Sequence, residues 1–328
     1  MGVIMEACAY ESERTVKVGV MVVPIPFPPD STPSPWGTEP VVSYAETRAM
    51  AVQAEAAGFD SVWVFDHLLL RYPDQPPEGV WECWTILSAL AEATHRVEIG
   101  TLVICTAFRS PALLAKMAVT LDEVSNGRLI LGLGSGWHQP EFDAIGIPFD
   151  AKVDRFAEAL AIIAPLLREG HVDFEGQHYR ATESAILPRG PRPNGPPILI
   201  GSRTGPRMMR LTAHYADYWN TGWMGGNATW LAAPRAEVAA ACAAEGRDPA
   251  TLGVTVGVRV ICGTPEGGAE QLPGSERALS GTPEEIALGL RSHADAGVAH
   301  VICSLAPSTP TSLAHLTDAL AIYRHMIS

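Results

Sequence analysis

The strongest constraint on the fold is a strand-then-helix pattern that repeats eight times along the 328 residues. Each unit begins with a short apolar run rich in β-branched residues and continues into a stretch whose apolar residues recur at helical spacing. Strands that alternate with helices form parallel sheets, and eight such units close a TIM barrel. An open doubly wound sheet rarely carries eight units without a break between two halves. The predicted fold class is therefore α/β, a (β/α)8 TIM barrel with insertions.

The predicted elements divide the chain into a tail and one domain. We expect residues 1–14 to be a disordered N-terminal tail and residues 15–328 to be a single barrel domain. The predicted strands are 16–23, 61–66, 97–104, 128–133, 197–201, 218–221, 252–262 and 300–305. The predicted helices are 41–57, 81–93, 111–124, 150–168, 205–216, 228–245, 282–296 and 312–326.

Three insertions interrupt the regular spacing. Residues 172–180 alternate around Glu175-Gly176 and predict a small β-hairpin between strands 4 and 5. A proline-rich segment, 24–40, and a Gly/Pro segment, 263–281, each follow a strand. In a barrel such loops rise over the catalytic face, so both are predicted to be lids.

Composition excludes several classes of protein. Hydrophobic residues make up 47% of the chain and charged residues 18%, which favours a packed globular protein. No apolar run is long enough to cross a membrane, and the acidic N-terminus does not resemble a signal peptide, so we expect a cytoplasmic protein and no membrane partner. The net charge of −13 argues against a nucleic-acid partner. The six cysteines show no zinc spacing, and no metal site is predicted.

Alternating glycines mark the end of the fourth strand, in LILGLGSGW. Dinucleotide binding requires G-x-G-x-x-G opening a helix directly, whereas Gly132, Gly134 and Gly136 are spaced G-x-G-x-G and Trp137 occupies the sixth position. We therefore reject the dinucleotide interpretation. Two interpretations stay open: the glycines let a large flat ligand lie against the backbone, or they relieve crowding at a bend.

Arginines cluster just past the middle of the sequence. Five fall within 22 residues, namely Arg189, Arg192, Arg203, Arg207 and Arg210. The guanidinium group suits forked recognition of phosphate or carboxylate, so the cluster predicts an anion site; a solvated loop and helix face is the alternative.

Several long stretches resemble one known superfamily. They include AEAAGFDSVWVFDHLL (54–69), the segment from WECWTILSAL to SNGRL (81–129), GRLILGLGSGWHQPEFDAIGIPF (127–149), PPILIGSRTGPRMMRLTAHYADYWNTGW (196–223) and TPEEIALGLRSHADAGVAHVIC (282–303). These resemble the bacterial luciferase-like flavin and deazaflavin oxidoreductases, in particular members labelled coenzyme F420-dependent. The resemblance implies a TIM barrel that holds FMN or F420 near the ends of strands 2 to 4, a small-molecule substrate, and a homodimer joined through the helices after strands 2 and 3.

The same resemblance assigns catalytic roles to His67, Asp66 and Trp137. His67 ends strand 2, where F420-using relatives carry a histidine near the reactive carbon, and histidine exchanges protons near neutral pH. A histidine that only shapes the pocket is the alternative. Trp137 stands where sugar-phosphate dehydrogenases of the family carry a catalytic glutamate, so it implies a wall of an apolar substrate pocket and disfavours a sugar phosphate. Glu141 is expected to cap or pair structurally.

The resemblance also implies a set of cofactor-binding residues. A non-proline cis peptide, Leu102–Val103, is expected in a bulge that supports the ring. A Gly-flanked loop entering a helix is expected to bind the phosphate through its backbone amides. Arg109 has a structural ion pair as its alternative. The expected cofactor-binding residues are Leu102, Val103, Thr106, Arg109, Ser135, Gly136, Gly201, Ser202, Arg203, Thr204 and Gly205.

The nature of the cofactor separates three functional hypotheses. F420 carries an oligoglutamate tail, along which Arg189, Arg192 and Arg207 are expected to lie, and this favours an F420-dependent oxidoreductase that transfers hydride between the deazaflavin C5 and a small organic substrate. The alternative is a two-component monooxygenase that uses reduced FMN from a partner reductase. The second alternative is a non-catalytic flavin-binding protein on the same scaffold.

Overall fold

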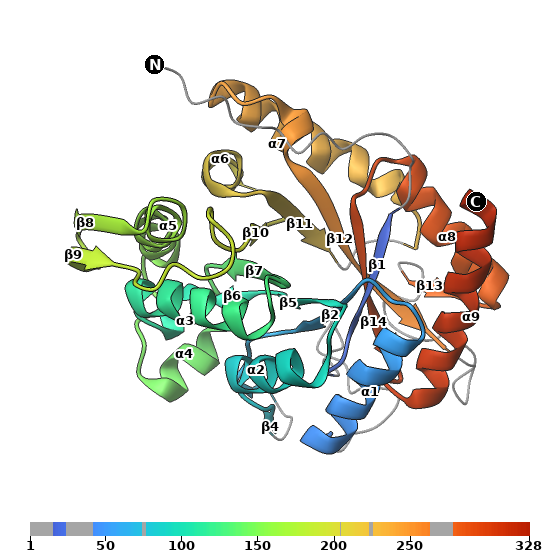
Figure 1. Ribbon diagram of the computed structural model, residues 1–328. Helices are drawn as coiled ribbons and strands as arrows, with labels where there is room; N and C mark the ends of the chain where they lie inside the picture. Colours follow the sequence, from blue (N-terminus) through green and yellow to red (C-terminus); the bar gives the residue numbers. More distant parts are fainter. Residues whose placement is uncertain (1–15, 24–41, 74–76, 204, 223–225, 263–277) are drawn as a thin grey trace.

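A closed ring of parallel strands forms the centre of the molecule. The structure, a computed structural model, describes residues 16–23, 42–73, 77–203, 205–222, 226–262 and 278–328 (Figure 1). Within them eight strands hydrogen-bond in a cycle, and the last pairs with the first. The predicted TIM barrel is confirmed. In cyclic order the strands are β1 (Lys17–Met21), β2 (Ser61–Val64), β5 (Glu98–Thr101), β7 (Leu129–Gly134), β10 (Ile198–Gly201), β11 (Tyr218–Gly222), β12 (Gly253–Ile261) and β14 (His300–Ala306).

A helix follows each of these strands and covers the outside of the barrel (Figure 1). Two helices begin with capping boxes, in which Ser43 pairs with Glu46 and Thr282 pairs with Glu285. No helix within the described residues combines the length and the hydropathy that crossing a membrane requires. The eight covering helices are α1 (Tyr44–Ala56), α2 (Cys83–Ala93), α3 (Pro111–Val124), α5 (Lys152–Arg168), α6 (Pro206–Tyr215), α7 (Ala232–Ala244), α8 (Pro283–Asp295) and α9 (Pro310–Ile327).

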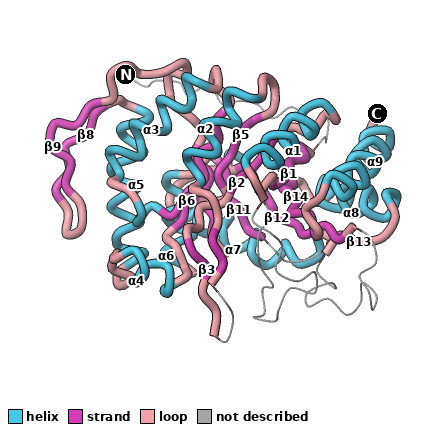
Figure 2. Tube along the Cα trace, turned by 90° about the horizontal axis from the view of Figure 1, so that it is seen from below, coloured by secondary structure: helices cyan, strands magenta, loops and turns pink. Residues whose placement is uncertain are grey.

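The predicted hairpin between strands 4 and 5 is also confirmed. Antiparallel β8 (His171–Glu175) and β9 (Arg180–Ala185) form an arm that projects from the barrel beside α5 (Figures 1 and 2). The predicted tail, 1–14, the predicted lid at 24–40 and residues 263–277 of the second lid lie outside the described residues.

Other short elements lack a sequence signal because they are too short to show periodicity. They are β3 (Leu69–Leu70), β4 (Glu78–Gly79), β6 (Ile104–Cys105), β13 (Leu279–Ser280), the seven-residue helix α4 (Gln139–Ile145) and the 3-10 turns η1 (Thr106–Phe108), η2 (Ala228–Leu231) and η3 (Pro249–Thr251).

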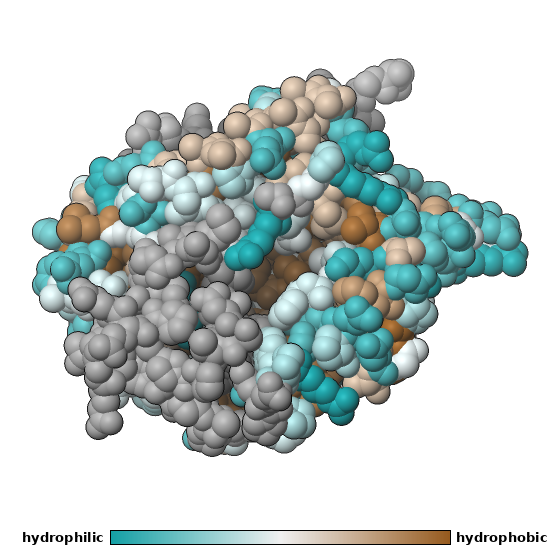
Figure 3. Space-filling view, turned by 180° about the vertical axis from the view of Figure 1, so that it is seen from behind, coloured by the Kyte–Doolittle hydropathy of each residue, from teal (hydrophilic) through white to brown (hydrophobic). Residues whose placement is uncertain are grey.

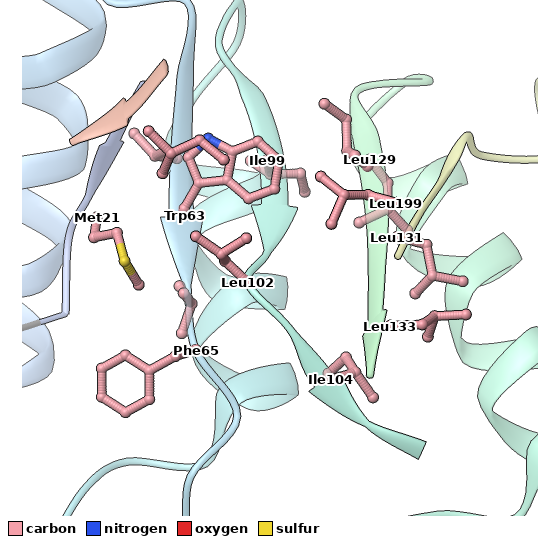
Figure 4. Packing of buried hydrophobic residues seen from close by; sticks show 14 of the residues in the cluster. Met21, Trp63, Phe65, Ile99, Leu102, Ile104, Leu129, Leu131, Leu133 and Leu199 are labelled. Carbon is pink, nitrogen blue, oxygen red and sulfur yellow. The ribbon is translucent and has the colours of Figure 1, made fainter. Parts of the chain in front are cut away.

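A buried tryptophan fills the barrel interior near the amino ends of the strands. Trp63 lies close to Ile99 and Leu102 (Figure 4). Its Nε1 donates to Ser61 Oγ at 2.6 Å, and Ser61 Oγ lies 2.7 Å from His300 Nε2. Burial, with a smaller effect of the Lys17 charge, lowers the pKa of His300 to about 3, so this histidine stays neutral. A Cβ at Gly100 would lie 2.3 Å from the Trp63 ring. Because Trp63, Ser61 and His300 fill the interior near the amino ends of the strands, a ligand can bind only at the carboxyl ends.

The third strand of the barrel, called strand 3 below, consists of β5 (Glu98–Thr101) and β6 (Ile104–Cys105), and it carries a bulge where it pairs with β7. Gly100 pairs with Ile130 and Ile104 pairs with Leu133, so four steps along strand 3 face three steps along β7. At the bulge the side chain of Thr101 takes the place of backbone hydrogen bonds between the two strands. Its Oγ1 accepts from the Gly132 amide and donates to the Gly132 carbonyl, both at 2.8 Å.

The alternating glycines of β7 make room for this bulge. A Cβ at Gly132 would lie 1.9 Å from the Thr101 carbonyl oxygen, and one at Gly134 would lie 2.7 Å from the Val103 side chain. At Gly136, where φ is +77°, a Cβ would meet Phe142 and Cys105. Protein atoms therefore occupy the space in front of these glycines. The expectation that a flat ligand lies against them is wrong, and the crowding interpretation holds.

We predict that Gly132→Ala destabilises the protein by about 2–3 kcal/mol, because the added methyl overlaps a backbone oxygen that cannot move without disturbing the barrel. Gly79→Ala is the matched control, since a Cβ at Gly79 has no atom within 4 Å. Urea unfolding of both variants measures the difference. Equal stability of the two would contradict the steric role of Gly132.

Candidate active site

The structure brings most of the predicted site residues to one end of the barrel. Residues that follow parallel strands share the carboxyl end of the sheet, and the predicted residues follow β2, β5–β6, β7 and β10. The face of the molecule turned away from the viewer of Figure 1 is hollowed near its centre, and the floor of this hollow is hydrophobic (Figure 3). Thr204 lies outside the described residues.

His67 lies three residues beyond the end of β2, and its side chain is bound by a carboxylate. Its Nδ1 is 3.0 Å from Glu141 Oε2, and 14% of its side chain is exposed. The Trp137 indole meets the imidazole edge to face at a centroid distance of 5.6 Å, and Phe65 contacts it at 5.7 Å. Two predicted catalytic residues, His67 and Trp137, are thus in contact although they lie 70 positions apart.

Glu141 is the buried anchor of this loop. It belongs to α4, is 2% exposed, and accepts hydrogen bonds from the backbone amides of Leu68 and Leu69 in addition to that of His67 Nδ1. Burial by itself raises the pKa of Glu141, but the bonds from His67 and the two amides outweigh it, and the net pKa lies below the ordinary value. Glu141 is therefore ionised at neutral pH.

The sequence analysis missed two residues, His138 and Tyr72, that add to the contact between α4 and the chain segment after β2. His138 Nε2 accepts the Arg71 amide at 3.0 Å, and burial lowers the pKa of His138. The Tyr72 ring lies 5.3 Å from the His138 ring. Burial, then the charges of Glu78 and Glu141, raise the pKa of Tyr72 to about 12. The β3–β4 hairpin is thus tied to α4 at two points. The only sequence signal was the position of His138 beside Trp137.

Asp66 and Arg109 form a buried ion pair. The Arg109 guanidinium binds both carboxylate oxygens of Asp66, at 2.6 and 3.0 Å, and also contacts Glu82. The Cys105 amide donates to Asp66 at 3.0 Å, and the Asp66 side chain is fully buried. Burial raises the pKa of Asp66, although Arg109 and the amide oppose this. Every one of these contacts joins protein to protein, so the pair fixes the end of strand 3 beside the end of β2.

The end of strand 3 contains the predicted cis peptide, Leu102–Val103. The Val103 side chain lies between the backbones of Gly134 and Gly201 and is only partly buried. Thr106 is buried and its Oγ1 donates to the Gly134 carbonyl at 3.3 Å. Ser135 and Gly136 follow at the same end of β7 and are half-buried.

The loop after β10 leads into the N-terminus of α6. Gly205 is the residue before the helix, with φ of +108° and open space where a Cβ would point. Ser202 Oγ accepts from Trp219 Nε1 at 3.1 Å, and exposed Arg203 donates to the Gly222 carbonyl at 3.4 Å. After Pro206, which has no N–H, the amides of the first turn of α6 point away from the helix body, and such a helix N-terminus is the usual geometry of an anion site.

Two of the clustered arginines lie at the opposite end of the barrel. Arg192 pairs with Asp122 and donates to the carbonyl of Leu129, the first residue of β7. Arg189 donates to carbonyls in the last turn of α5. The expectation that these two line a cofactor tail is wrong, because Arg192 binds a carbonyl at the amino end of β7 and Arg189 binds carbonyls at the end of α5. Arg207, which pairs with Asp154, remains near the loop after β10.

Comparison with known proteins identifies relatives. The model of the luciferase-like monooxygenase family matches residues 16–272. The chain is 37% identical over 174 residues to an F420-dependent glucose-6-phosphate dehydrogenase of Amycolatopsis mediterranei, covering 51% of this chain and 50% of that protein. It is 32% identical over 216 residues to the pyrimidine monooxygenase RutA of Rhizobium rhizogenes, covering 63% and 58%. The matches thus span 50% and 58% of the length of these two relatives.

A solved structure is similar over almost the whole chain. An F420-dependent secondary alcohol dehydrogenase in complex with an F420-acetone adduct superposes with a TM-score of 0.76 at 20% identity, covering 94% of this chain and 99% of that one. At this identity the likeness concerns the fold.

We predict that Arg109→Met destabilises the protein by about 3–5 kcal/mol at pH 7, because Asp66 then stays buried without its partner. Without Arg109 the pKa of Asp66 rises further above its unfolded value, so protonation favours the folded state and the loss shrinks as pH falls toward 5. Thermal and urea unfolding at both pH values test this. Arg291→Met, which breaks the exposed pair with Asp295, is the control and should cost below about 1 kcal/mol. A loss independent of pH would contradict the role of the Asp66 charge.

Proposed function

The chain belongs to the luciferase-like monooxygenase family, and from this premise we propose that it is an F420-dependent oxidoreductase that transfers hydride between the deazaflavin and a small organic substrate. The proposal rests on the pairing of His67 with Glu141 at the carboxyl end of β2, beside the strand 3 bulge. A histidine held in this way suits proton exchange with a substrate while hydride moves. The match to an F420-dependent dehydrogenase supports the choice of cofactor.

The residues at the mouth fit a planar ring with a phosphate tail. Val103 keeps an exposed face between Gly134 and Gly201, which can support the back of a ring. Arg203, Ser202 and the N-terminus of α6 offer a guanidinium, a hydroxyl and backbone amides to a phosphate. When bound, the deazaflavin supplies a carbon that accepts or releases hydride.

The side chains of the chain itself would orient the substrate and move its proton. His67 Nε2 lies on the ring edge away from the Nδ1 that binds Glu141, so the proton of a substrate hydroxyl would be exchanged there. The Trp137 indole, 53% exposed, would form an apolar wall next to His67. An indole offers neither charge nor a general base, and we therefore propose a small alcohol or carbonyl compound rather than a sugar phosphate as substrate.

One other function has support from a relative. The match to a pyrimidine monooxygenase favours, as second candidate, a monooxygenase that uses reduced FMN from a partner reductase. The same His67 and the same barrel mouth would serve both reactions. The identity of the bound cofactor separates the two.

We predict that the purified chain binds F420 more tightly than FMN in spectral titrations. His67→Ala should bind F420 with unchanged affinity, and its turnover with a panel of secondary alcohols should fall about 10²–10⁴-fold, because the proton acceptor is lost. Binding of FMN alone would support the monooxygenase, and binding of neither would remove both candidates. Full turnover of His67→Ala with F420 bound would contradict the proton-transfer role.

We also propose that the chain acts in the cytoplasm as a homodimer joined through α2 and α3. A shallow groove of about 190 Å³ runs between these helices. Val124 in this groove is 49% exposed, and Leu113, earlier on α3, is 55% exposed, so exposed apolar side chains adjoin an apolar groove. The groove is lined by Trp84, Ser88, Lys116, Met117, Thr120, Leu121 and Val124.

We predict that light scattering gives a mass near twice the 35.0 kDa of the chain, and that Leu113→Asp converts the dimer to a monomer. Leu288→Asp is the matched control, because Leu288 on α8 is 59% exposed and lies away from the groove. A monomeric wild-type protein, or dissociation by both variants alike, would count against this interface.

A further inference from the structure

We propose that Glu141 is a positioning residue that fixes the proton of His67 on Nδ1, so that the neutral imidazole accepts a proton only at Nε2. This inference rests on the proposed role of His67. Glu141 would determine which nitrogen of the imidazole accepts the proton of the substrate.

Within the part of the chain that the structure describes, Glu55, Glu141 and Glu158 each bind N–H groups of three consecutive residues, and only the donors of Glu141 include a side chain. Glu55 accepts the backbone amides of His95, Arg96 and Val97. Glu158 accepts those of Gln177, His178 and Tyr179. All six of these donors are backbone amides. The contacts of Glu55 and Glu158 therefore fix the path of a loop and orient no side chain.

Glu141 differs from Glu55 and Glu158 in what it binds. Its Oε1 accepts the amides of Leu68 and Leu69, and its Oε2 lies 3.0 Å from His67 Nδ1. The imidazole therefore takes the place that a third backbone amide has in the other two loops. A single carboxylate fixes both the path of the chain after β2 and the orientation of the ring.

The charge of Glu141 decides which nitrogen carries the proton. An ionised carboxylate only accepts hydrogen bonds, so Nδ1 must be the donor. Neutral His67 then has its lone pair on Nε2, and a proton taken from a substrate O–H forms the Nε2–H bond as the O–H bond breaks. The resulting imidazolium is stabilised by the carboxylate 3.0 Å away.

Glu141→Gln tests this because it keeps the shape and reverses one hydrogen bond. The amide oxygen of glutamine can still accept the two backbone amides, but its NH₂ group donates toward Nδ1 and moves the ring proton to Nε2. NMR of protein labelled with ¹⁵N-histidine distinguishes the two tautomers without any cofactor, and His67→Ala identifies the His67 signals. We expect the Nδ1–H form in the wild-type protein and the Nε2–H form in Glu141→Gln.

Glu158→Gln is the matched control, since it weakens a three-donor loop anchor remote from His67. With F420 and the alcohol panel, kcat of Glu141→Gln should fall about 10²–10⁴-fold with little change in KM, as a wrong tautomer does in other histidine enzymes. Glu158→Gln should stay within about twofold, while both variants lose some thermal stability.

The wild-type spectrum tests the inference even if Glu141→Gln does not fold. An Nε2–H tautomer, or a ring that is doubly protonated throughout pH 6–9, would overturn it, and so would an unchanged tautomer in a folded Glu141→Gln. Absence of F420 turnover in the wild-type protein would instead refute the proposed function and leave the tautomer result intact, so the two failures are distinguishable.

Discussion

The bulge of the third barrel strand, β5–β6, fits against β7 at two alternate residues without side chains, Gly132 and Gly134. Between Gly100 and Ile104 strand 3 has one residue more than its neighbour, and the extra length presses the Thr101 carbonyl and the Val103 side chain onto Gly132 and Gly134. Protein interiors are close-packed, so a single methyl group at Gly132 would displace backbone on both strands. Because the ends of β5–β6, β7 and β10 meet at Val103, the geometry of the barrel mouth depends on this contact.

Buried acids hold the other side of the mouth. Asp66 ties the end of β2 to strand 3 through Arg109 and the Cys105 amide, and Glu141 ties the next three residues to α4. Each carboxylate would be costly to bury alone, and each is fully engaged by donors from segments distant in the chain. His67 is therefore positioned from both sides, by the ion pair before it and by the carboxylate anchor beside it.

The candidate site was partly predictable from position alone. A residue that directly follows a barrel strand must lie at the carboxyl end, so His67 and Trp137 were expected at the same mouth and lie in contact there. For Glu141 only a structural cap or pair was expected, and its partner was not predictable, because it belongs to a seven-residue helix whose partner loop is about 70 positions away. The arginine cluster misled for the same reason. Arg189 binds carbonyls in the last turn of α5 and Arg192 binds the carbonyl of the first residue of β7, whereas Arg203 follows β10.

The sequence by itself determined the number and order of the barrel strands, the helices that cover them and the hairpin arm, because hydrophobic periodicity and helix caps are local properties of the chain. Only the tertiary structure decided what the glycines of β7 accommodate, which arginines face the mouth, and which carboxylate holds His67. These depend on contacts between residues far apart in the chain, 31 positions for Thr101 and Gly132 and 74 for His67 and Glu141. Such contacts exist only once the barrel has closed, and the pattern of residues along one strand or helix does not encode them.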